Sequence, residues 1–219
     1  MSEIYEQPVG FQRFKDGYLK VLQGNTHADM VMPIAYWNPM AKSHLLDKIA
    51  ELIDAGGESV ATLALHQLNP SVANIRQGVN FQVSLCIADD LKGGWTNRHS
   101  TEYDTCFKLS GFLGREFCVP VFWSSETYTQ DLIIERVKAA CFRTIWRLDH
   151  PSLRTLGEHL DQEAFVRHKI GLTTKNESSK IQDFITLHAS SEDFGLIFNV
   201  LYGDTASESL GMPTYGLKP

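Results

Sequence analysis

Alternating apolar and polar residues predict short strands in three places along the chain. The alternation is clearest in residues 81–88 (FQVSLCIA), where every second side chain is large and apolar. Residues 117–123 (FCVPVFW) alternate in the same way, and residues 30–37 (MVMPIAYW) form a third apolar run. Pro33 and Pro120 interrupt two of these runs, and proline within a sheet is found mainly at edges or bulges. We therefore expect short, edge-like strands.

Apolar residues at helical spacing predict several helices. Asn38-Pro39 supplies a capping residue and a first-turn proline, and Thr127 with Gln130 fits a capping box before the longest helical pattern. The run 58–68 also tolerates a period of two, so a strand remains open there, and residues 102–109 have the character of a returning strand. The predicted helices are residues 38–55, 58–68, 127–148, 153–164 and 181–188.

The order of these elements is strand, helices, strands and helices, which is typical of an α+β protein. We expect a small mixed sheet of about three to five strands with helices packed mainly on one face. An α/β arrangement with a βαβ unit at residues 30–68 is the alternative. A chain of 219 residues fits one large domain or two small ones. We expect a single globular domain over residues 1–219, with a candidate linker at residues 173–179 before a short C-terminal segment.

The charge of the chain bears on its partners. Acidic residues outnumber basic ones by 26 to 20, which gives a net charge of -6, and the basic residues are scattered. Nucleic-acid binders usually carry a basic surface, so we expect no nucleic-acid partner. We also expect no membrane partner, because no apolar run approaches the ~18 residues of a membrane span. The first residues (MSEIYE) lack a secretory signal, so a cytoplasmic location is expected.

The four cysteines are interpreted as buried thiols. They are far apart, and no pair has the Cys-x-x-Cys spacing of a thiolate zinc site. In a cytoplasmic protein disulfides are rare, and free cysteine behaves as a small apolar residue.

Residues 89–104 (DDLKGGWTNRHSTEYD) hold the densest group of chemically versatile side chains. They follow the predicted strand 81–88, and loops held by a rigid strand often carry binding and catalytic groups. A polar surface hairpin is the alternative, because Asp and Gly-Gly also supply turn chemistry.

Polar residues follow each of the three predicted strands at its end. Asn38 follows the first, Asp89-Asp90 the second, and residues 124–126 the third. If the strands are parallel, these ends lie on one edge of the sheet, which is where open α/β sheets bind ligands. An antiparallel arrangement would separate them.

The candidate site combines these strand ends with the 89–104 loop. Adjacent carboxylates can take different pKa values and act as acid and base, Arg98 can grip a carboxylate or phosphate, and the two glycines allow close backbone approach. His99 and Glu102 would share a face only on a helix, and the local sequence favours strand or loop, so a divalent metal has little support and the cofactor is unknown. The predicted catalytic residues are Asp89, Asp90, His99 and Glu126, and the predicted ligand-binding residues are Asn38, Gly93, Gly94, Trp95, Arg98 and Tyr103.

Two functions remain open on this reasoning, and whether the protein is an enzyme is undecided. The first is binding of a small polar metabolite, or acid–base or metal-assisted hydrolysis or transfer on it. The second is a non-catalytic protein-interaction or oligomeric structural subunit, in which a homo-oligomer would fit. The aromatic residues near the strand ends would form its surface; they are Tyr36, Trp37, Trp95, Phe122 and Trp123.

Overall fold

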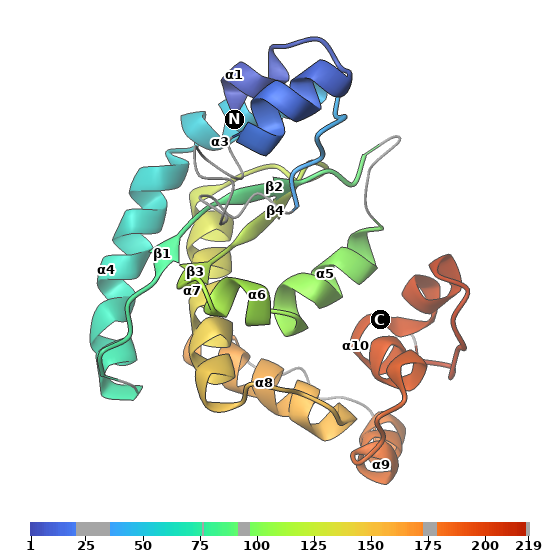
Figure 1. Cartoon of the computed structure of the whole chain (residues 1–219). Coiled ribbons are helices and arrows are strands. Elements are labelled where there is room, and N and C mark those ends of the chain that lie inside the picture. The colour runs from blue at the N-terminus through green and yellow to red at the C-terminus, as the bar shows by residue number, and fades with distance from the viewer. Residues whose placement is uncertain (21–35, 76, 92–96, 173–178, 218–219) are drawn as a thin grey trace.

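Helices dominate the fold. A computed structural model of the chain describes residues 1–20, 36–75, 77–91, 97–172 and 179–217 (Figure 1). The helices are α1 (Ser2–Tyr5), the π-helix η1 (Arg13–Tyr18), α3 (His44–Asp54), α4 (Gly57–Ile75), α5 (Arg98–Phe107), α6 (Ser110–Leu113), α7 (Gln130–Asp149), α8 (Leu156–Lys169), α9 (Ser179–His188) and α10 (Phe194–Ser209). No helix among the described residues combines the length and the apolar character needed to cross a membrane.

The strands are two or three residues long and pair in parallel. Strand β1 (Gln82–Val83) pairs with β3 (Phe117–Cys118), and β2 (Cys86–Ala88) pairs with β4 (Val121–Trp123). The two pairs are separated by a break that contains the predicted irregularity Pro120, whose carbonyl still accepts a hydrogen bond from the Cys86 N–H at 3.0 Å. The ladder is therefore a narrow two-stranded ribbon.

The predicted fold class is wrong. The described residues contain two two-stranded parallel pairs rather than one mixed sheet of three to five strands, and helices lie on more than one side of them. Figure 1 shows the strand pairs near the centre of the molecule, with α4 on one side, α5 and α6 on the other, and α7 behind. Two parallel strands expose apolar side chains on both faces, so helices are required on both to bury them.

Several predicted helices are present with shifted bounds. The longest, α7, begins after Thr129, whose side chain accepts from the Leu132 N–H, rather than at the capping box predicted from Thr127. Pro70 lies inside α4, so the helix predicted over residues 58–68 continues past it. The strand predicted over residues 102–109 is wrong, because α5 occupies most of that stretch and is capped by Asn97.

Parts of the other sequence predictions fall on undescribed residues. Most of the predicted strand 30–37, on which the βαβ alternative depends, lies outside the described residues, and so does most of the candidate linker 173–179. The prediction of buried thiols is confirmed, since all four cysteines are free and buried.

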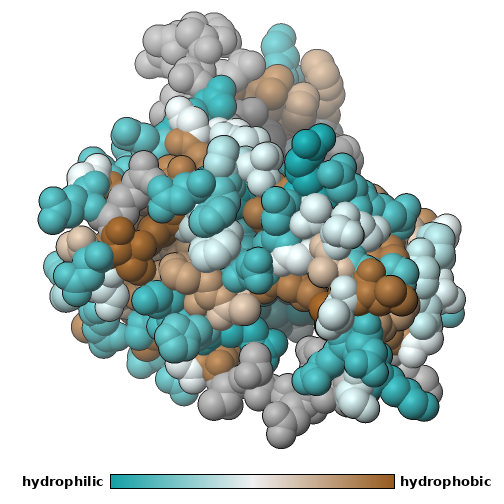
Figure 2. Space-filling view, turned by 90° about the horizontal axis from the view of Figure 1, so that it is seen from below, coloured by the Kyte–Doolittle hydropathy of each residue, from teal (hydrophilic) through white to brown (hydrophobic). Residues whose placement is uncertain are grey.

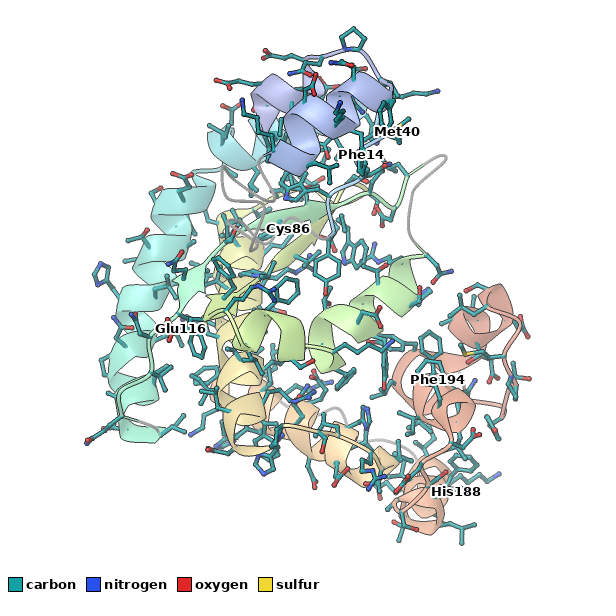
Figure 3. The ribbon with its side chains drawn as sticks, in the orientation of Figure 1. Phe14, Met40, Cys86, Glu116, His188 and Phe194 are labelled. Atoms are coloured by element: carbon teal, nitrogen blue, oxygen red, sulfur yellow. The ribbon has the colours of Figure 1, made fainter. Side chains whose placement is uncertain are left out.

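The apolar side chains form two clusters. The larger one surrounds the strand pairs and is built from α3, α4 and α7, with Phe122 and Ile133 fully buried in it. The second joins α5, α8 and α10 around Tyr103 and Phe198. In Figure 3, Cys86 lies on the strand ribbon, whereas Phe194 lies on the C-terminal helix α10. The face seen in Figure 2 is largely hydrophilic and is interrupted by separate hydrophobic groups.

A buried histidine belongs to the second cluster. His159 on α8 is 2% exposed, its Nδ1–H donates to the Thr155 carbonyl at 2.7 Å, and its Nε2 accepts from the Tyr103 hydroxyl at 2.9 Å. Burial lowers the pKa of His159, and the nearby Arg147 adds to the effect. The folded protein therefore holds this imidazole neutral.

The lowered pKa of His159 predicts a loss of stability in mild acid. The unfolded chain takes up a proton near the ordinary histidine pKa of about 6.5, whereas the folded chain resists protonation. The free energy of unfolding should therefore decrease as the pH falls below about 6.5 towards the folded pKa. Chemical denaturation of wild type and His159→Gln between about pH 7.5 and 5.5 tests this.

His159→Gln should have a lower free energy of unfolding than wild type at neutral pH, but this free energy should change less with pH. The exposed His66 supplies the matched control, because His66→Gln should keep the wild-type slope. An unchanged slope in His159→Gln would contradict the assignment.

Candidate functional site

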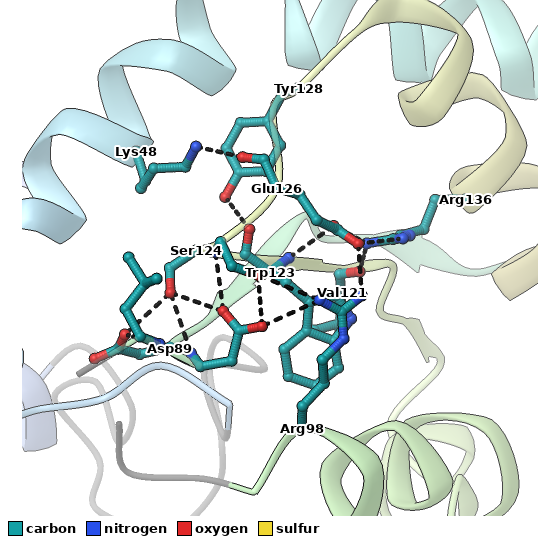
Figure 4. Close-up of polar contacts among 12 residues, drawn as sticks. Lys48, Asp89, Arg98, Val121, Trp123, Ser124, Glu126, Tyr128 and Arg136 are labelled. Carbon is teal, nitrogen blue, oxygen red and sulfur yellow. Dashed lines mark hydrogen bonds and ion pairs between the residues drawn. The ribbon is translucent and has the colours of Figure 1, made fainter. Parts of the chain in front are cut away.

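The parallel register of β2 and β4 brings two strand ends together. Ala88 lies opposite Trp123, and the Ser124 N–H donates to the Ala88 carbonyl at 2.9 Å, so both chains leave the ribbon side by side. Figure 4 shows the polar contacts that follow. We call this group the strand-end cluster; it consists of Asn38, His44, Asp89, Asp90, Arg98, Ser124, Ser125, Glu126 and Arg136.

Asp89 is the buried centre of the cluster. Its carboxylate is 1% exposed and accepts from Asn38 Nδ2 and His44 Nε2, both at 2.9 Å, and from Ser124 Oγ at 3.0 Å. Burial alone would raise the pKa of Asp89, but the hydrogen bonds from Asn38, His44 and Ser124 outweigh it and hold that pKa below its ordinary value. Asp89 is therefore a fixed anion at neutral pH.

Asp90 turns to the same edge. Its carboxylate accepts from the Ser125 N–H at 2.9 Å, from Ser125 Oγ at 2.7 Å and from Arg98 Nη1 at 3.2 Å. Ser124 Oγ lies within hydrogen-bond distance of both Asp89 and Asp90. Neighbours on a continuous strand would point to opposite faces, but the strand ends at Ala88, so both carboxylates serve one site.

Glu126 holds two arginines. Arg98 Nη2 donates to its Oε1 at 3.0 Å, and Arg136 donates to both oxygens at 2.6 and 3.1 Å. The Trp123 N–H adds a fourth hydrogen bond at 3.1 Å. The guanidinium of Arg98 also lies over the Trp123 ring, 5.2 Å from its centroid, which is a cation–π arrangement. Glu126 therefore fixes the start of α5 against α7.

The carboxylates of the cluster are all engaged by protein donors. Three carboxylates face two guanidinium groups, and every carboxylate accepts several hydrogen bonds from protein donors. Such carboxylates act as anchors rather than as free proton acceptors. Arg98 is the most exposed of the charged groups of the cluster, with 39% of its side chain exposed.

The structure separates some of the predicted site residues. It brings five of them together in the strand-end cluster: Asn38, Asp89, Asp90, Arg98 and Glu126. His99 instead lies against Tyr202 of α10, with ring centroids 6.1 Å apart, and Tyr103 is buried against His159. Gly93, Gly94 and Trp95 lie outside the described residues.

Sequence reasoning missed His44 and Arg136. His44 begins α3 six residues after Asn38, and Arg136 lies in the second turn of α7. Their partners are far away in the chain, so spacing alone gives no signal for either. The one available hint for Arg136 is that it stands near the start of the helix that follows the polar strand end.

A polar cavity of about 170 Å³ opens beside the cluster. It lies between α5, α7 and the chain from Val119 to Trp123, and we call it the charged pocket. Trp123 and Arg136 belong both to its wall and to the region of the strand-end cluster. Its remaining polar or titratable lining is Glu102, Thr105, Cys106, Glu135, Arg143 and Thr144.

Cys106 is the thiol of this pocket. Burial raises the pKa of Cys106 to about 11, against an opposing effect of the nearby Arg143. The group is therefore a neutral thiol at physiological pH and adds no charge to the pocket.

A second, larger cavity of about 940 Å³ lies on the other side of the ribbon. It is bounded by α1, α3, α4 and residues 83–87, and its lining is mainly apolar, with Glu58 as its charged side chain among the described residues. It shares no residue with the strand-end cluster.

No protein-family model matches the chain, and no curated protein or solved structure is significantly similar to it. Among the described residues, no three His, Cys, Asp or Glu side chains are grouped to hold a metal ion. The function must therefore be inferred from the geometry of the site.

Removing the charge of Asp89 should destabilise the protein. Asp89→Asn keeps the size of the side chain but replaces the carboxylate by a neutral amide. The donors from Asn38, His44 and Ser124 then lose their charged acceptor. Hydrogen bonds to buried charged groups contribute about 1.5–3 kcal/mol each, so we expect a loss of about 2–3 kcal/mol in the free energy of unfolding. Urea denaturation at neutral pH measures it.

The control is the exposed Asp183 on α9. Asp183→Asn should change stability by less than about 0.5 kcal/mol. An equally small effect of Asp89→Asn would show that the cluster does not hold the strand ends together.

Proposed function

We propose that this protein binds a small polar metabolite at the edge of the ribbon where the strand-end cluster meets the charged pocket. The observation that carries the proposal is the parallel register of β2 and β4, which places Asp89-Asp90 beside residues 124–126. Ligands of parallel sheets are bound outside the carboxyl ends of the strands.

The rigidity of the cluster supports binding. Asp90 is almost fully buried and Glu126 is largely so, and both are held by hydrogen bonds to backbone and side-chain donors. Side chains that are already ordered lose little entropy when a ligand arrives. A charged cluster of this kind is costly to bury, so its presence at a strand edge favours a role beyond packing.

The residues have distinct roles in this proposal. Arg98 and Arg136 are the cations that meet the ligand, because the first faces solvent and the second lines the charged pocket. Asp89 and Asp90 position the strand ends, and Glu126 orients the two arginines. The proposal extends to binding and not to hydrolysis or transfer, since the carboxylates have their oxygens occupied by protein donors.

The alternative, a non-catalytic protein-interaction subunit, has less support from the site. Trp37, Phe122 and Trp123 are buried, so these aromatic residues do not form the exposed surface that this alternative requires. Trp95 lies outside the described residues, and Tyr36 is partly buried.

Replacing Arg98 tests the proposed site. Thermal shifts of wild-type protein are measured with small carboxylic acids, amino acids, sugar phosphates and nucleoside monophosphates, together with mass spectrometry of small molecules released from the purified protein. A polar compound should raise the melting temperature and bind saturably. Arg98→Gln should weaken its binding at least tenfold, which is about 1.4 kcal/mol. The variant should stay folded, because ion pairs of exposed arginines contribute only up to about 1 kcal/mol.

The exposed Arg154 gives the control, and Arg154→Gln should bind as wild type does. Failure of every compound to bind, or wild-type affinity in Arg98→Gln, would overturn the proposed site. In that case a protein complex seen by analytical ultracentrifugation would favour the alternative.

A further inference from the structure

The walls of the charged pocket carry charges of both signs. Helix α5 contributes Glu102 to one wall, and helix α7 contributes Arg136, Arg143 and the exposed Glu135 to the other. Apolar side chains, among them Ala140 and Val119, complete the lining. A ligand in this pocket therefore meets an anion on one side and a cation on the other.

Arg143 keeps hydrogen-bond donors for a ligand. Its Nε and Nη2 form a forked pair with Glu163 at 2.8 and 2.7 Å, but its Nη1 has no acceptor among the described residues. The side chain is 21% exposed, and its Nη1 group keeps contact with solvent. An unused guanidinium donor at a pocket wall is well suited to a ligand carboxylate.

Glu102 is the complementary group. It is partly buried, and no hydrogen bond or ion pair to its carboxylate is present in the described part of the chain. It follows Arg98 by four residues on α5, so the two side chains share a helix face. Glu102 thus extends the strand-end cluster into the pocket with a negative charge that has no partner among the described residues.

The volume of the pocket limits the ligand. At about 30 Å³ per water molecule, 170 Å³ corresponds to about five or six waters. That space suits a molecule of the size of glycine, alanine or serine.

We propose that the charged pocket binds the zwitterion of a small α-amino acid, with its carboxylate at Arg143 and its ammonium group at Glu102. This inference rests on the proposed function and names its ligand class, and it adds Glu102 and Arg143 to Arg98 and Arg136 as groups that contact the ligand. A simple anion would bind the free Arg143 donor but would be repelled by Glu102, and a simple cation would leave that donor without an acceptor. A zwitterion supplies an acceptor for the free Arg143 donor and a positive charge for Glu102.

Isothermal titration calorimetry with glycine, alanine and serine tests the inference, with acetate, methylammonium and inorganic phosphate as the single-charge probes. In wild type, at least one of the amino acids should bind saturably, and acetate and methylammonium should each bind at least tenfold more weakly. Glu102→Gln should weaken the amino acid at least tenfold and leave acetate binding unchanged or stronger. This variant should fold normally, because the Glu102 carboxylate makes no ion pair in the described structure.

Two further variants test whether binding takes place in the charged pocket. Glu192→Gln removes an exposed charge elsewhere and should bind as wild type does. Ala140→Leu fills the pocket without altering a charge and should abolish amino-acid binding; far-ultraviolet circular dichroism checks that it is folded.

The inference is overturned if none of the three amino acids binds wild type, or if Glu102→Gln binds them as wild type does. If phosphate or a carboxylic acid then binds in a manner that depends on Arg98, the proposed function stands and the ligand class alone is wrong. If no small polar compound binds at all, both proposals fail.

Discussion

The buried carboxylate of Asp89 is the interaction on which the rest of the site depends. It joins the segment that carries Asn38 and His44 to the ends of both β2 and β4, which are far apart in sequence. A two-stranded ribbon is weak by itself. The buried anion and its donors stabilise the register that sets Asp90 and Glu126 beside each other, and the position of every other charged group follows from that register.

Three arginines of helix α7 connect the strand-end cluster and the neighbouring helices to this helix. Arg136 is held by Glu126 at the strand end, and Arg143 is held by Glu163 of α8. Arg147 is buried and donates to backbone carbonyls, including that of Phe107 at the end of α5. Each arginine fastens α7 to a different neighbour, so the spacing between α5 and α7, which defines the charged pocket, is set at several points.

The convergence of the polar strand ends could be predicted from sequence, whereas most of the sheet could not. The alternation over residues 81–88 correctly placed a strand and the polar residues after it, but alternation does not reveal how many strands pair. Helix α5 was missed because the polar residues around its Asn97 cap resemble a loop. His159 lies on a helix whose charged residues are typical of a solvent-facing surface, yet it is buried because Tyr103 supplies a partner from a distant segment.

The hydroxyl of Ser124 has one hydrogen and two carboxylate neighbours. It lies 3.0 Å from Asp89 and 3.1 Å from Asp90, so it can serve only one of them at a time. Asp90 has Arg98 and Ser125 as further hydrogen-bond donors. When Arg98 moves, Asp90 gains or loses a donor, and the Ser124 hydroxyl turns away from it or towards it. A movement of the Arg98 guanidinium therefore changes the hydrogen bonding of the buried Asp89 carboxylate. It does so through rotation about the Cβ–Oγ bond of Ser124, without any displacement of the backbone.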